Sequence, residues 1–499
     1  MSTRAVVIGS GFGGLAAAVR LRARGYDVTV LEALDQPGGR ARVFRQDGFS
    51  FDAGPTVITA PYLLDELFAL VGRDARDYFT LVPVDPFYRI LFHDGSAFDY
   101  VGDDDRLMEQ IAAFNPRDVD GYRRLVEHAR RIFDVGYIQL ADRPFTHARD
   151  MMRVLPQMLR LGSHRSVYDV VASHIRDERL RQAFSFEPLL VGGDPFRTTS
   201  IYLLIHWLER KWGVHFAMGG TTSIVHGLVR LLGELGVDVR MNAPVARILV
   251  QGGRTIGVEL QDGDVVPADV VVSNADPSFV YRHMVDEPYL RRHNMRRVSR
   301  VKQSMGLFVA YFGTSRTYED VKHHTIVMGP RYRGLLDDIF RRRVLADDFS
   351  LYLHAPTRTD PSLAPAGHEG FYVLSPVPNN RSGIDWAAEG DRYFDTIMAE
   401  LERRVIPGAR ASLVTSRFMT PNEFEHDLRS VDGSAFGPEP VLTQSAYFRY
   451  HNVSEDVRGL YFVGAGTHPG GGVPGVLCSA KVLDRVVPAP AANGARRTA

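Results

Sequence analysis

A glycine-rich turn between a short apolar strand and a helix constrains this chain more than any other part of its sequence. The turn has the spacing Gly-x-Gly-x-x-Gly over residues 9–14 and follows the apolar run 5–8. An amphipathic helical pattern over 15–24 comes next, and a second strand-like run, 27–32, ends on a carboxylate. This order of strand, turn, helix and strand predicts a βαβ unit in a parallel sheet that is covered on both faces.

The three glycines of this turn have separate physical roles in holding a dinucleotide. Gly9 permits a tight turn, Gly11 lets a pyrophosphate approach the backbone, and Gly14 allows the helix to pack closely on the strand. The N-terminus of the helix offers free N–H groups and the positive end of its dipole to the phosphates. Glu32 would accept hydrogen bonds from a ribose diol. Because these parts occur together, the sequence predicts a dinucleotide site rather than a glycine-rich turn without a ligand.

Comparable α/β patterns return twice further along the chain. A helix is predicted over 221–235, strands over 237–241, 244–250, 255–260, 268–273 and 460–463, and a last helix over 476–486. Two long insertions separate these pieces. The first contains helical patterns over 111–133, 167–184 and 201–211, and the second contains strand-like runs over 307–312, 349–354 and 370–377 with a helix over 391–405.

We therefore predict an α/β fold in which a discontinuous, Rossmann-like nucleotide domain carries an inserted α+β domain. The predicted divisions are 1–60, 216–284 and 446–487 for the three segments of the nucleotide domain, 61–215 for a helical substrate- and membrane-associating region, 285–445 for a substrate-binding domain, and 488–499 for a disordered tail.

The composition excludes several classes of protein and of binding partner. Lys+Arg 59 and Asp+Glu 59 give a formal net charge of +0, so no basic field is present to hold a polyanion and nucleic acid is not expected as a partner. The lone cysteine excludes an intrachain disulfide framework and a Cys-rich zinc site, and it indicates a reducing compartment. No run reaches the ~18 apolar residues of a membrane-spanning helix, and the early strand leaves no room for a signal peptide. We expect a cytoplasmic protein.

Two further glycine-rich segments favour FAD over NAD. A Gly-Gly-Arg sequence at residues 38–40 follows the predicted ribose acid and resembles that of amine-oxidase-like FAD enzymes, where the arginine pairs with the cofactor phosphates. Residues 464–475 have the form of a strand–turn–helix whose glycines let the backbone lie against a flat ring, and Pro474 suits the first helical turn. The N-terminus of that helix would stabilise negative charge on a reduced flavin. No second Gly-x-Gly-x-x-Gly follows a strand, so no separate NAD(P) site is expected.

Motifs along nearly the whole chain resemble one family. They are residues 49–59, 180–186 with 189–193, 440–446, and 464–481, of which the last is the most specific. With these motifs the chain resembles the bacterial-type phytoene desaturases of the carotenoid/retinoid oxidoreductase family. The nucleotide domain is then a Rossmann-like FAD-binding domain. The predicted cofactor-binding residues are Gly9, Gly11, Gly13, Gly14, Glu32, Gly39, Arg40, Gly54, Pro55, Thr56, Val245, Gly464, Gly466, Gly475 and Val476.

The resemblance implies FAD-dependent, stepwise desaturation of phytoene, a C40 polyene, and of partly desaturated carotenes toward neurosporene or lycopene. Phytoene has no carbonyl to acidify its C–H bonds, so we expect hydride transfer to flavin N5, which leaves an allylic cation that sheds a proton. This chemistry requires an apolar tunnel, a positioned ring and one proton acceptor, and it requires neither a metal nor a catalytic triad. We therefore predict no metal site.

Three residues are candidates for handling that proton. His468 lies in the terminal glycine loop, where it would be near the flavin, and fixing the loop by a hydrogen bond is its alternative role. Asp150 and Arg153 share one helical face, for which a surface ion pair is the alternative. Other polar residues near the 189–193 motif are Glu187, Asp194 and Arg197.

Because phytoene resides in the bilayer, the resemblance also implies peripheral contact with the inner face of the cell membrane. Residues 149–162 predict a short helix with arginines on one side and Met and Leu on the other, which is typical of an interfacial anchor. A helix packed on the core is the alternative. Residues 201–212 are apolar nearly all round and indicate either a buried helix or a tunnel wall.

Two other functions stay open on the sequence. A later-step carotenoid desaturase or a carotenoid ketolase would use the same FAD site, and a non-catalytic lipid-binding module would keep the fold without flavin. The complete set of glycines and Glu32 argues against the module. With no thiol pair and no second nucleotide motif, quinone or dioxygen is the expected electron acceptor. The sequence leaves the end product of desaturation open. It also leaves open whether the chain forms an oligomer.

Overall fold

The computed structural model describes residues 2–491, and its first strand forms the centre of a five-stranded parallel sheet. In spatial order the strands are β19 (Leu460–Phe462), β13 (Val270–Ser273), β1 (Arg4–Ile8), β2 (Asp27–Leu31) and β9 (Asp238–Arg240). β1 lies between β2 and β13, so the chain leaves β1 to one side and later returns on the other. That is the topological switch point of a doubly wound sheet, and the predicted α/β fold is confirmed.

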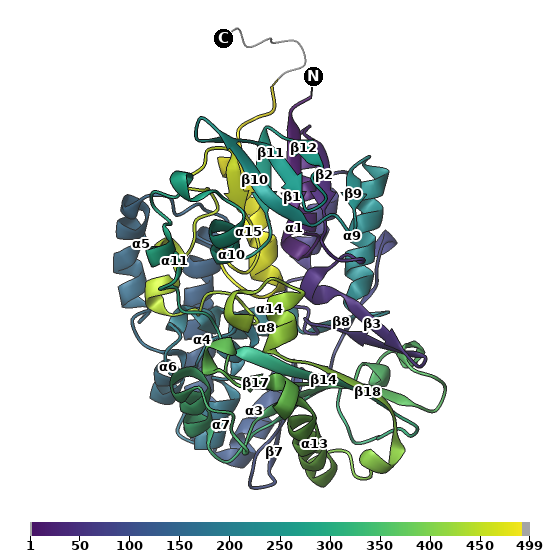
Figure 1. Ribbon diagram of the computed structural model, residues 1–499. Coiled ribbons are helices and arrows are strands. Elements are labelled where there is room, and N and C mark those ends of the chain that lie inside the picture. The colour runs from purple at the N-terminus through teal and green to yellow at the C-terminus, as the bar shows by residue number, and fades with distance from the viewer. Residues whose placement is uncertain (1, 492–499) are drawn as a thin grey trace.

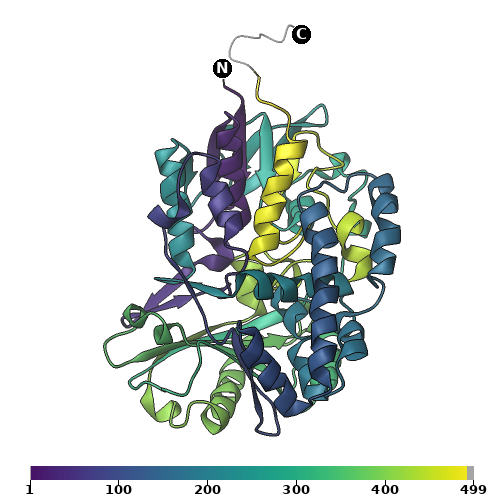
Figure 2. The ribbon, with the colours of Figure 1, turned by 180° about the vertical axis from the view of Figure 1, so that it is seen from behind.

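Helices cover one face of this sheet and a small second sheet covers the other. The helices are α1 (Phe12–Ala23), α9 (Thr222–Glu234) and α15 (Val473–Val486), with α2 (Tyr62–Ala69) beside them. The small antiparallel sheet contains β10 (Val245–Gln251), β11 (Arg254–Leu260) and β12 (Val265–Pro267). Figure 1 shows the small sheet in front, and Figure 2 shows the helices from behind. Because side chains alternate along β1, Val7 packs against the helices and Val6 against the small sheet.

A second, larger sheet forms the other half of the molecule. Its seven strands are, in spatial order, β18 (Leu413–Met419), β14 (Gly306–Thr314), β17 (Glu369–Val377), β16 (Leu351–His354), β15 (His324–Val327), β6 (Tyr88–Leu91) and β7 (Ala97–Tyr100). Two antiparallel pairs complete the strands, namely the hairpin of β3 (Val43–Gln46) with β4 (Phe49–Asp52) and the long-range pair of β5 (Leu81–Pro83) with β8 (His215–Ala217).

Both insertions contribute to this larger sheet, whereas residues 61–215 were predicted as a region rich in helix, without these strands. β6 pairs in parallel with β15, so that Ile90 lies opposite Ile326. The strands of the first insertion are short, and their partner is supplied from far along the chain. A local sequence pattern does not contain information about such a distant pairing. As a result of the pairing, the two insertions share one hydrophobic core.

Helices of the first insertion pack beside the large sheet (Figure 2), and further helices come from the rest of the chain. They are α3 (Asp104–Phe114), α4 (Asp118–Phe133), α5 (Ala148–Arg160), α6 (Val167–His174), α7 (Glu178–Ala183), α8 (Leu204–Trp212), α10 (Pro277–His283), α11 (Met295–Val298), α12 (Tyr332–Asp337), α13 (Trp386–Arg404) and α14 (Pro421–His426). α13 packs on β14 through the rings of Tyr393 and Phe308, whose centroids lie 5.1 Å apart.

Two predicted helices are broken in the structure. The 111–133 pattern divides into α3 and α4, because Pro116 forces the preceding Asn115 into an extended conformation at φ −159° and ψ 108°. The 167–184 pattern divides into α6 and α7. Between them the carboxylate of Asp118 accepts hydrogen bonds from the backbone N–H groups of Arg176 and Asp177. These two donors, which the break in the helix leaves without a helical partner, are thereby satisfied.

The helices next to the glycine turns begin earlier than predicted. α1 begins at Phe12 rather than residue 15, and α15 at Val473 rather than residue 476. Glycines lower helix propensity, so the patterns understate both N-termini. Within the described residues, no helix has the length and apolar character needed to cross a membrane. Residues 492–499 of the predicted tail lie outside the described residues.

Candidate active site

A long cavity begins at the carboxyl ends of β1 and β2 and continues between the two sheets. This is where a doubly wound sheet places its ligand. At this end the cavity is lined by the predicted cofactor-binding residues Gly9, Gly11, Gly13, Glu32, Gly39, Arg40, Gly54, Pro55, Thr56, Val245, Gly464, Gly475 and Val476. Segments near both ends of the chain, residues 9–13 and 464–476, therefore line the same cavity.

Glu32 is held rigidly in this lining. Its Oε2 accepts a hydrogen bond from the backbone N of Ser10 at 2.7 Å and from Ser10 Oγ at 2.6 Å, while Oε1 accepts from Leu34 N at 3.0 Å. The side chain lines the cavity although it is almost fully buried. Each carboxylate oxygen has more than one lone pair. Glu32 can therefore accept hydrogen bonds from ribose hydroxyls while Ser10 fixes the position of its carboxylate.

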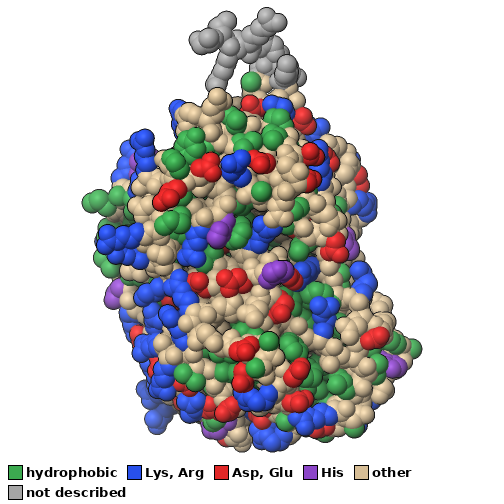
Figure 3. Space-filling model, in the orientation of Figure 1, with side chains coloured by type: hydrophobic (Ala, Val, Ile, Leu, Met, Phe, Trp, Pro, Cys, Tyr) green, Lys and Arg blue, Asp and Glu red, His purple; other side chains and the backbone are tan. Residues whose placement is uncertain are grey.

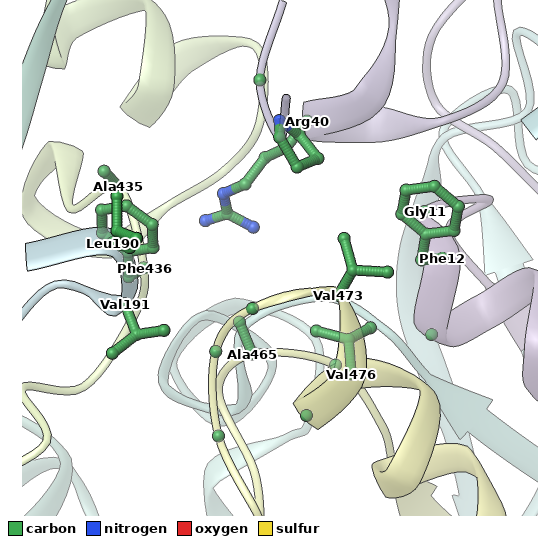
Figure 4. A pocket seen from close by; sticks show the side chains of 18 of the residues that line it. Gly11, Phe12, Arg40, Leu190, Val191, Ala435, Phe436, Ala465, Val473 and Val476 are labelled. Atoms are coloured by element: carbon green, nitrogen blue, oxygen red, sulfur yellow. The ribbon is translucent and has the colours of Figure 1, made fainter. Parts of the chain in front are cut away.

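Two helices present their N-termini to the cavity. α1 follows Gly11 and α15 follows Gly472, and neither N-cap residue makes a side-chain capping hydrogen bond. The first N–H groups of both helices are thus free to bind anionic oxygens. Figure 4 shows Val473 and Val476 at the start of α15 facing the same space as Phe12.

Arg40 supplies a positive charge to the same space. Its guanidinium reaches into the cavity (Figure 4), where Nη2 donates to Ser430 Oγ at 2.5 Å and Nε is buried with no partner among the described residues. Burial lowers the pKa of Arg40, and the nearby Asp276 carboxylate opposes that shift. A buried guanidinium with a free N–H fits the phosphates of a dinucleotide. The donors present here therefore fit FAD.

Two predicted cofactor-binding glycines lie outside the lining and serve packing instead. A Cβ on Gly14 would lie 1.9 Å from Gly9 O, and one on Gly466 would lie 2.3 Å from Pro277 Cδ. Gly14 thus has the close-packing role expected from its place in the turn. Gly466 lets the terminal loop pass the start of α10.

Asn274 is a lining residue that the sequence reasoning missed. It follows the last residue of β13, and its side chain lies against the glycine turn, so a Cβ on Gly11 would come within 2.8 Å of Asn274 Nδ2. Its position directly after a strand next to β1 is the signal that could have found it, because the carboxyl ends of parallel strands share one edge.

Away from the glycines the cavity becomes apolar. The wall includes Ile201, Leu204, Ile205 and Leu208 from the 201–212 segment, together with Leu189, Leu190, Met328, Leu335, Leu351 and Leu374. The 201–212 segment therefore forms a wall of the cavity. The carboxyl group of Glu209 also lines it and accepts a hydrogen bond from Tyr88 OH at 2.6 Å. Burial raises the pKa of Glu209 well above the ordinary value.

Comparisons with known proteins decide the family. The model of flavin containing amine oxidoreductases matches residues 12–481. The chain is 51% identical over 479 residues to the lycopene-forming phytoene desaturase of Pseudescherichia vulneris, covering 96% of this chain and 97% of that protein. It is 44% identical over 491 residues to the neurosporene-forming phytoene desaturase of Rhodobacter capsulatus, covering 97% and 94%. The chain belongs to the flavin-containing amine oxidoreductases, within the phytoene desaturase family.

Solved structures agree with this fold at low sequence identity. An oxidoreductase of Methanosarcina mazei superposes with a TM-score of 0.66 at 18% identity, covering 97% of this chain and 100% of that one. Putrescine oxidase superposes with a TM-score of 0.64 at 15% identity, covering 97% and 99%. The phytoene desaturase family thus shares the Rossmann-like architecture of FAD-dependent oxidases, and this chain is an FAD-dependent oxidoreductase.

His468 alone of the three predicted catalytic residues lines the cavity. It is buried, its Nε2 donates to Leu140 O at 3.1 Å, and its Nδ1 has no partner among the described residues. Burial lowers the pKa of His468 to about 4, so the imidazole is neutral near pH 7 and Nδ1 carries a lone pair. Both roles considered for this histidine, loop hydrogen bond and proton acceptor, are compatible with this geometry.

Asp150 and Arg153 lie on α5, outside the cavity lining. The Asp150 carboxylate accepts the backbone N–H of His147 at 3.1 Å and so caps the helix, while Arg153 is exposed. The other polar residues near the 189–193 motif have buried partners. Glu187 bonds to His206 Nδ1 at 2.8 Å, and Arg197 pairs with Glu439 at 3.2 Å.

Proposed function

We propose that this chain desaturates phytoene stepwise, through partly desaturated carotenes, to lycopene. The proposal rests on one observation above all, namely that the FAD cradle opens directly into a long apolar cavity. A hydrocarbon polyene offers only apolar surface, and burying it in such a cavity is favourable. Lycopene is preferred over neurosporene as the end product, since the lycopene-forming relatives are 50–51% identical and the neurosporene-forming ones 44%.

The chain's own residues would position the substrate and hold the proton. FAD, when bound, supplies a ring that accepts a hydride. The apolar walls would exclude water from the polyene beside that ring and keep it in line. We assign the proton lost from the substrate to His468 Nδ1, because His468 is a cavity-lining residue and this nitrogen is neutral and has no partner among the described residues. Asp150 would instead cap the N-terminus of α5, the proposed membrane-facing helix, and Arg153 would bind lipid headgroups from the surface of that helix.

We further propose that α5 is a membrane anchor beside the entrance for substrate. Met152, Leu155 and Leu159 are 72%, 41% and 51% exposed, which is unusual for large apolar side chains on one short helix. Met158 of the same helix is buried and lines the cavity, so lipid-facing and cavity-facing side chains are neighbours.

The charge around α5 fits a lipid surface. Arg149, Arg153 and Arg160 are exposed on this helix, and Figure 3 shows hydrophobic and basic side chains together at the edge where α5 lies in Figure 1. Apolar side chains would enter the acyl region while guanidinium groups bind headgroups. We place the protein at the inner face of the cell membrane, with quinone or dioxygen as electron acceptor.

Pigment analysis tests the proposed activity. The chain would be expressed in a phytoene-accumulating bacterial strain, and extracted carotenes would be resolved by chromatography with absorption spectra. Lycopene as the main product is expected. Phytoene left unchanged by a protein shown to contain FAD would overturn the proposal, and a product that stops at neurosporene would overturn the assignment of lycopene.

A further inference from the structure

Three buried histidines form a cluster behind the cavity wall, apart from the site described above. They are His323, His324 and His354, with exposed fractions of 6%, 0% and 1%. One ring nitrogen of each lies within 4.8 Å of those of the other two, and no other such group of three His, Cys, Asp or Glu side chains is found in residues 2–491. No metal site was predicted from the sequence, because the expected reaction requires none. His323 and His324 are adjacent along the chain, but only the fold brings His354 beside them.

The register of the large sheet brings the cluster together. His324 on β15 pairs directly with His354 on β16, and directly opposed residues of an antiparallel pair point to the same face. His323 precedes β15, and its Nε2 lies 3.1 Å from Nε2 of His354. The ring of Phe216 covers the cluster, with its centroid 4.7 Å from that of His323.

Hydroxyl groups hold the outer nitrogens of two of these rings. Tyr352 OH lies 2.7 Å from His324 Nδ1, and Thr359 Oγ1 lies 2.6 Å from His323 Nδ1. Metal-binding histidines characteristically have the second ring nitrogen fixed in this way, which orients the first toward the ion. The rings of His323 and His324 are therefore held in the orientation that a ligand needs, whereas Nδ1 of His354 has no partner among the described residues.

Hydrogen bonding alone leaves the cluster incomplete. The contact between His323 and His354 can be a hydrogen bond, but Nε2 of His324 is fully buried with no partner among the described residues. A buried ring nitrogen without a partner is costly in either tautomer.

We propose that His323, His324 and His354 bind one divalent ion of the zinc class. The 3.1 Å between the Nε2 atoms of His323 and His354 is close to the roughly 3.3 Å between two nitrogens on a tetrahedral Zn²⁺ with Zn–N of about 2.0 Å. Nε2 of His324 supplies the third ligand and water the fourth. The all-nitrogen ligand set disfavours Mg²⁺ and Ca²⁺, which prefer oxygen.

The ion would fix part of the cavity wall. Tyr352, which holds His324, also lies 2.7 Å from Thr56 Oγ1, and both Tyr352 and Thr56 line the cavity. Metal binding would thus set the position of a tyrosine beside the FAD cradle. The proposal does not depend on the identity of the substrate.

Zinc retention by the FAD-loaded full chain tests this proposal. The protein is dialysed against a chelator, mixed with Zn²⁺, separated by gel filtration and analysed for bound metal. About one Zn²⁺ per chain is expected, with affinity reduced at least 10-fold in His324→Gln and His354→Gln. Tyr352→Phe and Thr359→Ala, which alter only the outer hydrogen bonds, are expected to weaken binding by about 10-fold or more.

Matched variants keep the test decisive. His93→Gln changes an exposed histidine and Cys478→Ala removes the only thiol, and both should retain zinc at the wild-type level. FAD content reports folding, and if His324→Gln fails to fold, Thr359→Ala carries the test. Absence of retained zinc in the wild type, or equal retention by the folded cluster variants, would overturn the proposal.

Discussion

Ser10 and Glu32 are joined by two short hydrogen bonds at the switch point of the FAD-binding sheet, at 2.7 Å from the backbone N and 2.6 Å from Oγ. Ser10 follows the end of β1 and Glu32 follows the end of β2, so the pair ties the glycine turn to the ribose acid. The acid is thereby placed before the cofactor binds, which reduces the free energy spent on ordering it.

Removing this acid should weaken FAD binding strongly. Glu32→Ala deletes the carboxylate acceptor for ribose, and hydrogen bonds to a charged group are worth about 2–3 kcal/mol. That corresponds to roughly a 30- to 150-fold higher Kd for FAD. Ser10→Ala, which keeps the backbone bond, should cost less. Titration of the apoprotein with FAD measures both, and Glu109→Ala, at an exposed position, is the control. Unchanged FAD affinity in Glu32→Ala would contradict this role.

Two glycine-to-alanine changes should have opposite effects. At Gly14 the new Cβ would lie 1.9 Å from the carbonyl oxygen of Gly9, a contact that only a backbone shift relieves. We expect loss of FAD binding or of folded protein. At Gly233, near the end of α9, nothing lies within 4 Å of the new Cβ, and alanine should stabilise the helix by about 0.5–1 kcal/mol. Thermal unfolding and FAD content report both outcomes, and a well-folded, FAD-loaded Gly14→Ala protein would show that the turn can expand.

Local patterns predicted the FAD half of the fold well, and the reason is physical. The glycine turn, the apolar strands and Glu32 lie close together in sequence, and each constrains the backbone where it stands. Asn274 was missed because its role depends on which strand lies beside β1. The break between α3 and α4 was missed although Pro116 signals it directly.

The other half of the molecule depends on pairings between distant residues. The parallel pairing of Ile90 with Ile326 and the opposition of His324 and His354 follow from sheet register, which local periodicity does not contain. The same limit applies to candidate residues. The helical pattern placed Asp150 on a helix correctly, but only the fold shows that this helix turns its Met158, rather than Asp150, toward the cavity.

Acid should destabilise the folded protein in part through His468. Burial lowers the pKa of His468 from 6.5 to about 4. Between these pH values the unfolded chain binds a proton that the folded chain does not, so stability is lost as the pH falls from 6.5 toward 4. The fall in Tm between pH 7 and pH 5 should therefore be smaller in His468→Gln than in the wild type. His93→Gln should show the wild-type fall, and an equal fall in all three proteins would contradict the assignment.

The exposed face of α5 should be required for membrane binding. Replacing Met152, Leu155 and Leu159 together by Asp removes the apolar surface and adds charge that anionic headgroups repel. We expect at least a 10-fold loss of co-sedimentation with liposomes at unchanged FAD content. Replacing Ile256, Val344 and Val414 by Asp, which are 46%, 53% and 47% exposed, is the matched control and should leave liposome binding intact. Equal loss in both triple variants would mean that the effect is not specific to α5.

Reduction of the bound flavin by phytoene in the absence of oxygen tests the proposed desaturation most directly. The purified FAD-loaded chain is bound to liposomes that contain phytoene, and the visible absorbance of the oxidised flavin is followed in the absence of dioxygen and quinone. The flavin is expected to lose its visible absorbance, and about one new carotene double bond should form for each flavin reduced. Persistent oxidised flavin in the presence of membrane-bound protein and phytoene would contradict the proposed desaturation.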